Sequence, residues 1–144
     1  MAATLTSLEP ATGATLWTGE AGDVDAEVAA ARGAWAGWAS RSLSYRVETL
    51  RRFANVARGS IEPFADLIAR ETGKPLWEAR TEVESVVNKV DISVSAYAER
   101  TSQRRLEGAL GARVAVRHKP HGVLAVLGPY NFPATCPTAT SSRP

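Results

Sequence analysis

A valine-rich stripe in the middle of the chain is the strongest periodic feature of the sequence. Apolar residues recur there at alternating steps of four and three, namely Val83, Val87, Val90, Val94 and Tyr97. This spacing predicts one long helix over about residues 76–102 with a single apolar face. Because valine lowers intrinsic helix propensity, such a helix draws its stability from packing rather than from local preference. Any fold of this chain must therefore cover the stripe with other elements.

The composition is that of an ordinary globular chain. The sequence has 144 residues, of which 44% are apolar and 22% are charged, close to the averages for folded domains. A chain of this length buries roughly 68–70% of its unfolded surface without a disulfide framework. Its formal net charge of +2 comes from interspersed basic residues, which argues against a nucleic-acid partner. No segment approaches ~18 consecutive apolar residues, and the start is unlike a signal peptide, so we expect a cytoplasmic protein without membrane contact.

Local signals predict a hairpin and three helices before the stripe. Residues 4–18 alternate loosely between apolar and polar around a Pro-Ala-Thr-Gly turn. Asp23 and Ser42 are suitable N-caps for two helices, the second of which ends near Gly59. A third, shorter helix ends at Gly73, where a C′ glycine is favoured. The helical spacing predicts that the core receives Trp35 and Trp38 from the first helix, Val47, Leu50, Phe53, Ala54 and Ala57 from the second, and Phe64, Leu67 and Ile68 from the third.

Two β-like runs follow the long helix. Residues 114–116 form a short one, and residues 123–127 are continuously apolar, as expected of a strand buried on both faces of a parallel α/β sheet. The second run leads directly into a turn, residues 128–133, with the sequence Gly-Pro-Tyr-Asn-Phe-Pro. Ligands of open α/β sheets bind at the carboxyl ends of the strands, so this turn is the first candidate for a functional site. The spacing alone leaves Asn131 either as a structural turn residue or as a polar group that faces a ligand.

Other site motifs are absent from the sequence. It contains no G-x-G-x-x-G dinucleotide fingerprint, and Gly73-Lys74 lacks the upstream glycine of a phosphate loop. The single cysteine, Cys136, cannot form an internal disulfide, and with only His118 and His121 nearby it cannot complete a zinc site. We therefore expect no metal and interpret both histidines as polar loop residues.

Three short segments together resemble the NAD(P)-dependent aldehyde dehydrogenase superfamily. They are residues 9–13 (Glu-Pro-Ala-Thr-Gly), residues 71–75 (Glu-Thr-Gly-Lys-Pro) and the turn at 128–133, in matching order and spacing. The resemblance covers roughly residues 5–134. Within the superfamily, the succinylglutamate-semialdehyde dehydrogenases of arginine catabolism are the most similar branch, through residues 71–79, 81–83, 88–89 and 117–123.

This resemblance implies an α/β fold and an enzymatic reaction. The chain is then the amino-terminal helical part and the first buried strand of a Rossmann-like cofactor domain that is incomplete. Its divisions are residues 1–21 for the hairpin, 22–112 for the helical part, 113–134 for the first strands and the turn, and 135–144 for the tail. The implied reaction oxidises a small-molecule aldehyde, N-succinylglutamate 5-semialdehyde, with NAD or NADP, in a homo-oligomer. The alternative is a non-catalytic helical interaction module derived from a dehydrogenase.

The resemblance also assigns roles to the turn. Asn131 matches the side-chain amide that donates to the oxyanion of the tetrahedral intermediate, a role that suits a preorganised neutral donor. Leu127, Gly128, Pro129 and Tyr130 match the segment beside the adenosine part of the cofactor, where glycine permits a close backbone approach. The family's nucleophilic cysteine and general-base glutamate lie further downstream. We therefore expect the 144 residues alone to be inactive and to bind no cofactor stably.

Lys89 and Ser85 are candidate substrate residues, and Lys89 has two interpretations. Both residues lie beside the apolar stripe of the predicted long helix. Lysine is mostly exposed in proteins, which favours a solvated flank for Lys89. The family instead places this helix beside the substrate tunnel, where a cation can bind the carboxylates of a succinylated amino-acid aldehyde.

The last ten residues, 135–144, depart from the family pattern and have no apolar periodicity. In the resembling enzymes the turn continues as His-Leu-Pro-Asn-Gly-His-Ile-Val-Pro-Ala. Arginine strongly outnumbers lysine and alanine is abundant, which indicates a GC-rich coding sequence. The family stretch can be written in GC-rich codons that follow the codon of Ala134. When one C is removed where these codons begin, the shifted frame translates into residues 135–144 at every position. We interpret the tail as the product of a one-base frame shift, so that Cys136 exists only through the shift and is not the nucleophile.

The nucleotide sequence tests this interpretation directly. We expect a neighbouring frame, entered after the codon of Ala134, to encode His-Leu-Pro-Asn-Gly-His and to continue to the family's cysteine and glutamate. A locus without that alternative frame contradicts the shift and makes residues 135–144 a genuine divergent tail.

Overall fold

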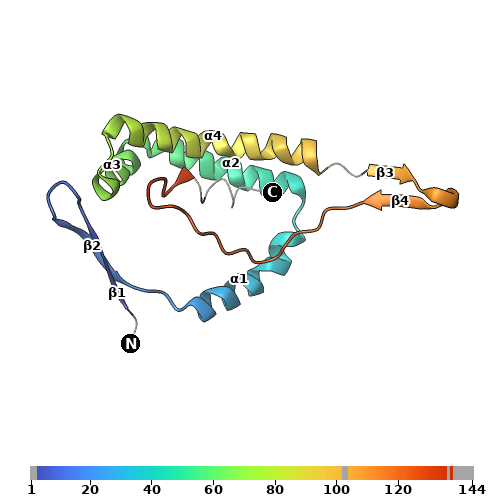
Figure 1. Ribbon diagram of the computed structural model, residues 1–144, viewed down its shortest axis with the longest axis horizontal. Helices are drawn as coiled ribbons and strands as arrows, with labels where there is room; N and C mark the ends of the chain where they lie inside the picture. The colour runs from blue at the N-terminus through green and yellow to red at the C-terminus, as the bar shows by residue number, and fades with distance from the viewer. Residues whose placement is uncertain (1–2, 102–103, 136, 138–144) are drawn as a thin grey trace.

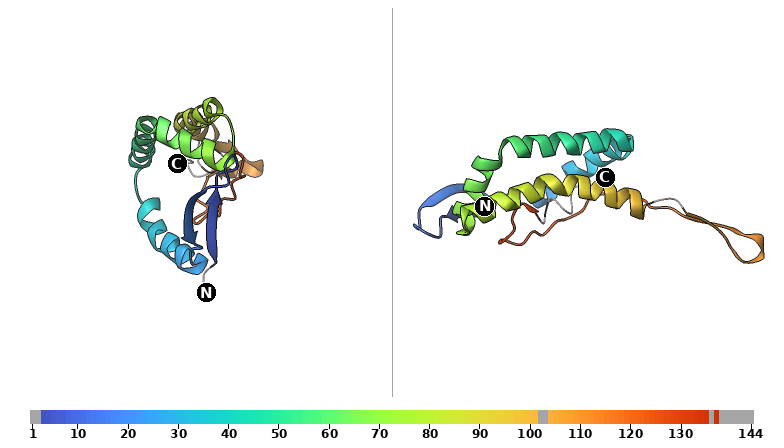
Figure 2. Two further views of the ribbon diagram at one scale, coloured as in Figure 1. Left: turned by 90° about the vertical axis from the view of Figure 1, so that its left-hand side faces the viewer. Right: turned by 90° about the horizontal axis from the view of Figure 1, so that it is seen from above.

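The structure of the protein is a computed structural model that describes residues 3–101, 104–135 and 137. Its elements in chain order are β1 (Thr4–Leu8), β2 (Thr15–Glu20), α1 (Val24–Ala39), α2 (Leu43–Gly59), α3 (Ile61–Thr72), α4 (Leu76–Arg100), β3 (Arg104–Glu107), a 3₁₀ turn (Ala109–Gly111) and β4 (Arg113–Val116). Figure 1 shows an elongated molecule in which α2, α3 and α4 lie together and a hairpin extends at each end. Beyond β4 the chain runs back past α1 toward the α3 end of α4, as the right-hand view in Figure 2 also shows.

The amino-terminal hairpin confirms the sequence prediction. Strands β1 and β2 pair antiparallel from Thr4 opposite Glu20 to Leu8 opposite Thr15. The connecting turn closes at Gly13, whose φ of 72° lies in the left-handed region that glycine tolerates. Glu9 then ties the turn to α3 through an ion pair of 2.9 Å with Arg70. Hydrogen bonds from the Thr12 hydroxyl and from Arg70 lower the pKa of Glu9, so its carboxylate stays ionised and this contact weakens only in acid.

The predicted helix boundaries are confirmed by their caps. The Asp23 carboxylate accepts hydrogen bonds from the first backbone N–H groups of α1, and the Ser42 hydroxyl accepts one from the backbone of α2. Helix α3 ends at Gly73, which adopts φ 74°. Helix α4 ends at Arg100 with Thr101 as its C-cap, so its length agrees with the predicted helix as far as the described residues extend.

The valine stripe forms the centre of the core, as predicted. Val83, Val86 and Val90 are the largest fully buried side chains among the described residues. Val87 and Val90 form one buried cluster with Ala54 and Ala57 from α2, and Val83 forms another with Ala65 and Ile68 from α3. The small alanines let the helices approach α4 closely, which places α4 against both α2 and α3. The rest of the predicted core is only partly buried at Val47, Leu50, Phe64, Val94 and Tyr97.

The predicted burial of four large side chains is wrong. Trp35 and Trp38 on α1 expose 43% and 41% of their surface, and Phe53 and Leu67 expose 46% and 45%. Helix α1 lies apart from the three-helix core, and its tryptophans border a hollow of about 280 Å³ against residues 122–124 of the returning chain. Amphipathic spacing identifies the apolar face of a helix, but the element that covers this face lies elsewhere in the sequence.

The predicted buried strand at 123–127 is also wrong in the described structure. These residues are irregular, with Leu124 exposed by 56% and Leu127 by 97%. A strand requires a neighbour that accepts and donates its backbone hydrogen bonds, and none of the described strands pairs with this segment. The run at 114–116 is extended as predicted and forms part of β4. This strand pairs antiparallel with β3, which the sequence did not predict, and the two form a hairpin that projects from the helices (Figure 1).

The predictions for the tail and for membrane contact can be compared with the structure only within the described residues. Of the tail 135–144, the structure describes Thr135 and Pro137, while Cys136 and residues 138–144 lie outside the described part. No helix in the described part of the chain is long and apolar enough to cross a membrane.

The exposed apolar surface leads to a prediction about stability. Expressed alone, the 144 residues should be insoluble or loosely folded, because the tryptophans of α1 and the segment 123–127 expose apolar surface that a stable domain covers. Near-UV circular dichroism and thermal denaturation check this expectation. Sharp near-UV bands from Trp35 and Trp38 together with a cooperative thermal transition would show that the chain folds by itself.

Candidate functional site

The turn at residues 128–133 lies against the junction between α3 and α4. It is formed by the returning chain, which ends beneath the beginning of α4 (Figure 1). The backbone N–H of Phe132 donates to the Pro129 carbonyl over 3.3 Å, which closes the turn around Asn131. After the turn, Ala134 packs against the buried cluster that α3 and α4 share. The turn is therefore attached to the core, although the segment before it is exposed.

Lys74 connects the helical corner to this turn. Its position is set by the left-handed Gly73 that ends α3 and by Pro75, which precedes α4. The Lys74 ammonium donates to the Asn131 carbonyl oxygen over 2.7 Å. The same nitrogen lies 4.6 Å from the centre of the Phe132 ring, within the range of a cation–π contact. Only 9% of the Lys74 side chain is exposed, so both contacts are largely shielded from water.

Glu82 completes the attachment from the buried face of α4. Its Oε2 accepts from the Lys74 ammonium at 2.7 Å, and its Oε1 accepts from the backbone N–H groups of Ala134 and Thr135 at 3.0 and 3.3 Å. Glu82 is the one charged residue that is buried among the described residues, with 3% of its surface exposed. A buried carboxylate is tolerated when a countercharge and hydrogen bonds satisfy it, and here both are present.

The Asn131 side chain is exposed at the end of this attachment. Within the described part of the chain its amide has no hydrogen-bond partner, whereas its backbone carbonyl is held by Lys74. A fixed backbone with an uncommitted side-chain amide is an arrangement that can present a hydrogen-bond donor to a ligand. The Asn131 amide is therefore available to a ligand, and its role as an oxyanion donor stays a prediction.

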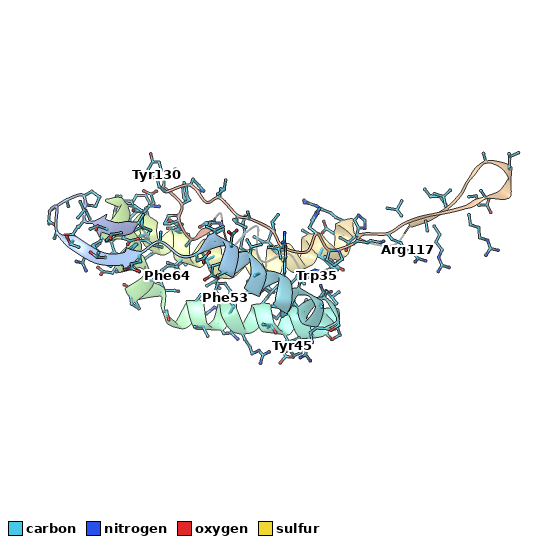
Figure 3. All side chains as sticks on the ribbon, turned by 90° about the horizontal axis from the view of Figure 1, so that it is seen from below. Trp35, Tyr45, Phe53, Phe64, Arg117 and Tyr130 are labelled. Carbon is cyan, nitrogen blue, oxygen red and sulfur yellow. The ribbon has the colours of Figure 1, made fainter. Side chains whose placement is uncertain are left out.

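The residues before Asn131 present apolar surface. Leu127 and Tyr130 expose 97% and 89% of their surface, and Figure 3 shows the Tyr130 side chain pointing away from the helices. Gly128 has a different environment, because a Cβ at this position would lie 2.6 Å from Cγ of Pro137. The close approach that glycine permits here is to the protein's own proline.

Ser85 and Lys89 follow Glu82 on the same face of α4. They lie three and seven residues after it, a spacing that keeps all three on one side of the helix. Since Glu82 contacts the returning chain, this face of α4 is turned toward the segment that carries Asn131. The Ser85 hydroxyl donates to the Thr81 carbonyl at 2.9 Å, and Lys89 is half-buried. No hydrogen bond or ion pair of the described residues joins either of them to Asn131.

Sequence reasoning gave no role to Lys74 or Glu82. Both were part of the family resemblance, but neither was a candidate site residue. A signal was present, because Glu82 occupies an apolar-stripe position between Ala79 and Val86, where a charge requires a partner. The sequence did not identify that partner, since the backbone of residues 134 and 135 is more than fifty positions away.

Comparison with known proteins agrees with this architecture. The family model for the aldehyde dehydrogenase family matches residues 2–142. The chain belongs to the aldehyde dehydrogenase family.

Curated relatives that match the chain are named for one reaction. The chain is 69% identical over 137 residues to an N-succinylglutamate 5-semialdehyde dehydrogenase from Sphingopyxis alaskensis, a match that covers 95% of the chain and 28% of the relative. It is 63% identical to a protein of the same name from Novosphingobium aromaticivorans, over 94% of the chain and 29% of the relative. The chain thus spans less than a third of the length of these relatives.

A solved structure shows the same fold. PnpE in complex with nicotinamide adenine dinucleotide superposes with a TM-score of 0.87 and 25% identity, over 97% of this chain and 29% of that one. The expected fold class is confirmed, since the described elements form part of an aldehyde dehydrogenase α/β fold.

Proposed function

We propose that this chain is the amino-terminal part of an NAD(P)-dependent dehydrogenase that oxidises N-succinylglutamate 5-semialdehyde to N-succinylglutamate. The observation that carries this proposal is the 69% identity, over 95% of the chain, to a relative named for that substrate. The geometry supports it, because the Asn131 turn is attached to the core through a buried ion pair. The remaining length of the relatives has to supply the nucleophilic cysteine and the general base, so the 144 residues alone are inactive in this proposal.

Asn131 is the residue of this chain that acts on the reacting atoms. When an aldehyde carbonyl is attacked, negative charge develops on its oxygen, and a donor already in place stabilises that charge without reorganising. The Asn131 amide is neutral and remains a donor at any physiological pH. Lys74 holds its backbone carbonyl, so rotation about the side-chain bonds is enough to aim the amide.

The residues before Asn131 suit the adenosine part of a nicotinamide cofactor. Leu127 and Tyr130 are almost fully exposed apolar side chains, and such surface fits a flat ring system. Pro129 lies between Gly128 and Tyr130 and stiffens this surface, because its φ is fixed. A bound nicotinamide cofactor supplies the hydride acceptor for the oxidation.

Lys89 is the residue of this chain that selects the substrate. The proposed aldehyde carries carboxylates, and a half-buried lysine on the face of α4 that turns toward the site is suited to bind one of them. Ser85, one helical turn earlier, has a hydroxyl that can donate to the same carboxylate by turning away from the Thr81 carbonyl.

The projecting hairpin supports a homo-oligomeric assembly. Strands β3 and β4 form a two-stranded ribbon away from the helices, in which Leu106, Val114 and Val116 are exposed. Edge strands with apolar side chains are a surface on which another chain can pair. A second copy of this chain is the partner we propose.

A chimera tests whether the chain supports catalysis. It joins residues 1–134 to the carboxyl-terminal remainder of the Sphingopyxis alaskensis relative. We expect it to reduce NAD or NADP with N-succinylglutamate 5-semialdehyde at a kcat/KM within about tenfold of the parent enzyme, because hydrophobic exchanges that keep volume and pattern are tolerated. A folded chimera without activity would instead favour the helical interaction module.

Replacement of Asn131 tests its role in the chimera. Asn131→Ala should lower kcat by about 10²–10³, the usual cost of one oxyanion donor, while the protein remains folded by near-UV circular dichroism. Asn55→Ala, which removes an exposed asparagine amide on α2, is the matched control and should leave kcat unchanged. An unchanged kcat in Asn131→Ala contradicts the proposed role.

Replacement of Lys89 tests substrate selection. In the chimera, Lys89→Met should raise KM for the succinylated aldehyde at least tenfold and spare small neutral aldehydes, because only the former carries carboxylates for the ammonium to bind. Lys119→Met, which removes an exposed lysine from the returning chain, is the control. Equal losses on both substrates would make Lys89 a structural residue.

A further inference from the structure

We infer that the Lys74–Glu82 ion pair is a positioning device that fixes the backbone of Asn131 for oxyanion binding. This inference rests on the function proposed for Asn131. No hydrogen bond of the described residues joins either side chain to the Asn131 amide, so both act through the backbone of the turn. They are positioning residues and not catalytic ones.

The pair holds the turn on both sides of its proline. Before Pro133, the Lys74 ammonium binds the Asn131 carbonyl at 2.7 Å and faces the Phe132 ring. After Pro133, the Glu82 carboxylate binds the N–H groups of Ala134 and Thr135 at 3.0 and 3.3 Å. The ion pair of 2.7 Å joins these two attachments. A shift of the turn must therefore break contacts on both sides at once.

Burial makes this pair a stiff link. The side chains of Lys74 and Glu82 are exposed by only 9% and 1%, so water does not compete well for either charge. By contrast, Arg80 and Glu62 join α4 to α3 at 2.8 Å with side chains that are 43% and 66% exposed. Exposed pairs of this kind contribute little and hold their partners loosely. Each pair has one partner on α4, so the exposed Arg80–Glu62 pair is a matched control for the buried Lys74–Glu82 pair.

The Lys74–Glu82 pair is suited to this role because it fixes the position of the Asn131 backbone without changing the net charge of the site. The ammonium and the carboxylate form a neutral pair, so the site gains no net charge from them. Displacement of a catalytic group by about 1 Å can lower a rate by about 10²-fold. A link that holds the Asn131 carbonyl therefore affects the rate through the position of the neighbouring amide.

The main test uses the chimera with both charges removed. Loss of one partner would leave the other charge buried and unpaired, so Lys74→Met and Glu82→Gln are combined. We expect the double variant to lower kcat about 10- to 100-fold, with cofactor affinity and near-UV circular dichroism close to those of the parent chimera. The control, Arg80→Met with Glu62→Gln, should leave kcat within about twofold.

A mutant cycle with Asn131→Ala separates positioning from general stability. If the pair acts through the Asn131 amide, removal of both charges should change kcat less than about threefold once that amide is absent. An equal loss in the presence and absence of the amide overturns the inference, as does an unchanged kcat in the double variant. If Asn131→Ala itself leaves kcat unchanged, the proposed function fails, which is a result distinct from failure of the device alone.

A single substitution keeps the test decisive if the double variant does not fold, because the Lys74 ammonium then loses its countercharge but keeps the Asn131 carbonyl as an acceptor. Glu82→Gln retains an oxygen that can accept from Ala134 and Thr135 but loses the ion pair with Lys74. We expect a loss of kcat of at least about threefold that disappears in the Asn131→Ala background. A Glu82→Gln chimera with the parent's kcat would overturn the inference.

Discussion

A carboxylate placed among valines must be neutralised and hydrogen-bonded, and this constraint at Glu82 organises the site. Glu82 lies on the face of α4 that also carries Val83 and Val86, where only 3% of its surface is exposed. Its two oxygens therefore need fixed partners, which are the Lys74 ammonium and the backbone of residues 134 and 135. Because these partners come from the corner before α4 and from the far end of the returning chain, satisfying one buried charge brings the two segments together.

The same corner also holds the amino-terminal hairpin. The Glu71 carboxylate accepts hydrogen bonds from the Ser7 hydroxyl and from the Trp17 indole, one on each strand of the hairpin. Two residues later Gly73 turns the chain, and its α-carbon approaches Pro10 closely enough that a Cβ would lie 3.5 Å from that ring. Lys74 then points to the opposite partner, the Asn131 turn. The motif Glu-Thr-Gly-Lys-Pro is thus a junction at which two distant segments are attached to the helices.

The sequence predicts those parts of the fold whose conformation depends on residues close to them in the chain. The caps at Asp23 and Ser42, the left-handed Gly73 and the burial of the valine stripe each follow from local chemistry. Wrong predictions arose where distant partners decide the outcome. Trp35 and Trp38 lie on an apolar face that the core does not cover, and residues 123–127 lack a strand to pair with. At the site, Asn131 was found through a family motif, whereas Lys74 and Glu82 required knowledge of contacts across more than fifty residues.

The hydrogen bonds that the Glu82 carboxylate accepts from the turn do not depend on which side chain follows Ala134. Glu82 binds backbone N–H groups, which residue 135 supplies whether it is threonine or the histidine of the family stretch. Two further described contacts of this region are the hydrogen bond that the Thr135 hydroxyl donates to the Glu82 backbone carbonyl at 3.4 Å and the close approach of Pro137 to Gly128. In the proposed one-base shift the family codon CCC at position 137 becomes CCA, and both encode proline. The backbone N–H groups and the proline ring are thus common to both reading frames, whereas the hydrogen bond of the Thr135 hydroxyl is made only by the shifted residue. This explains in physical terms how the Asn131 turn can keep its attachment to α4 beside a tail whose sequence departs from the family.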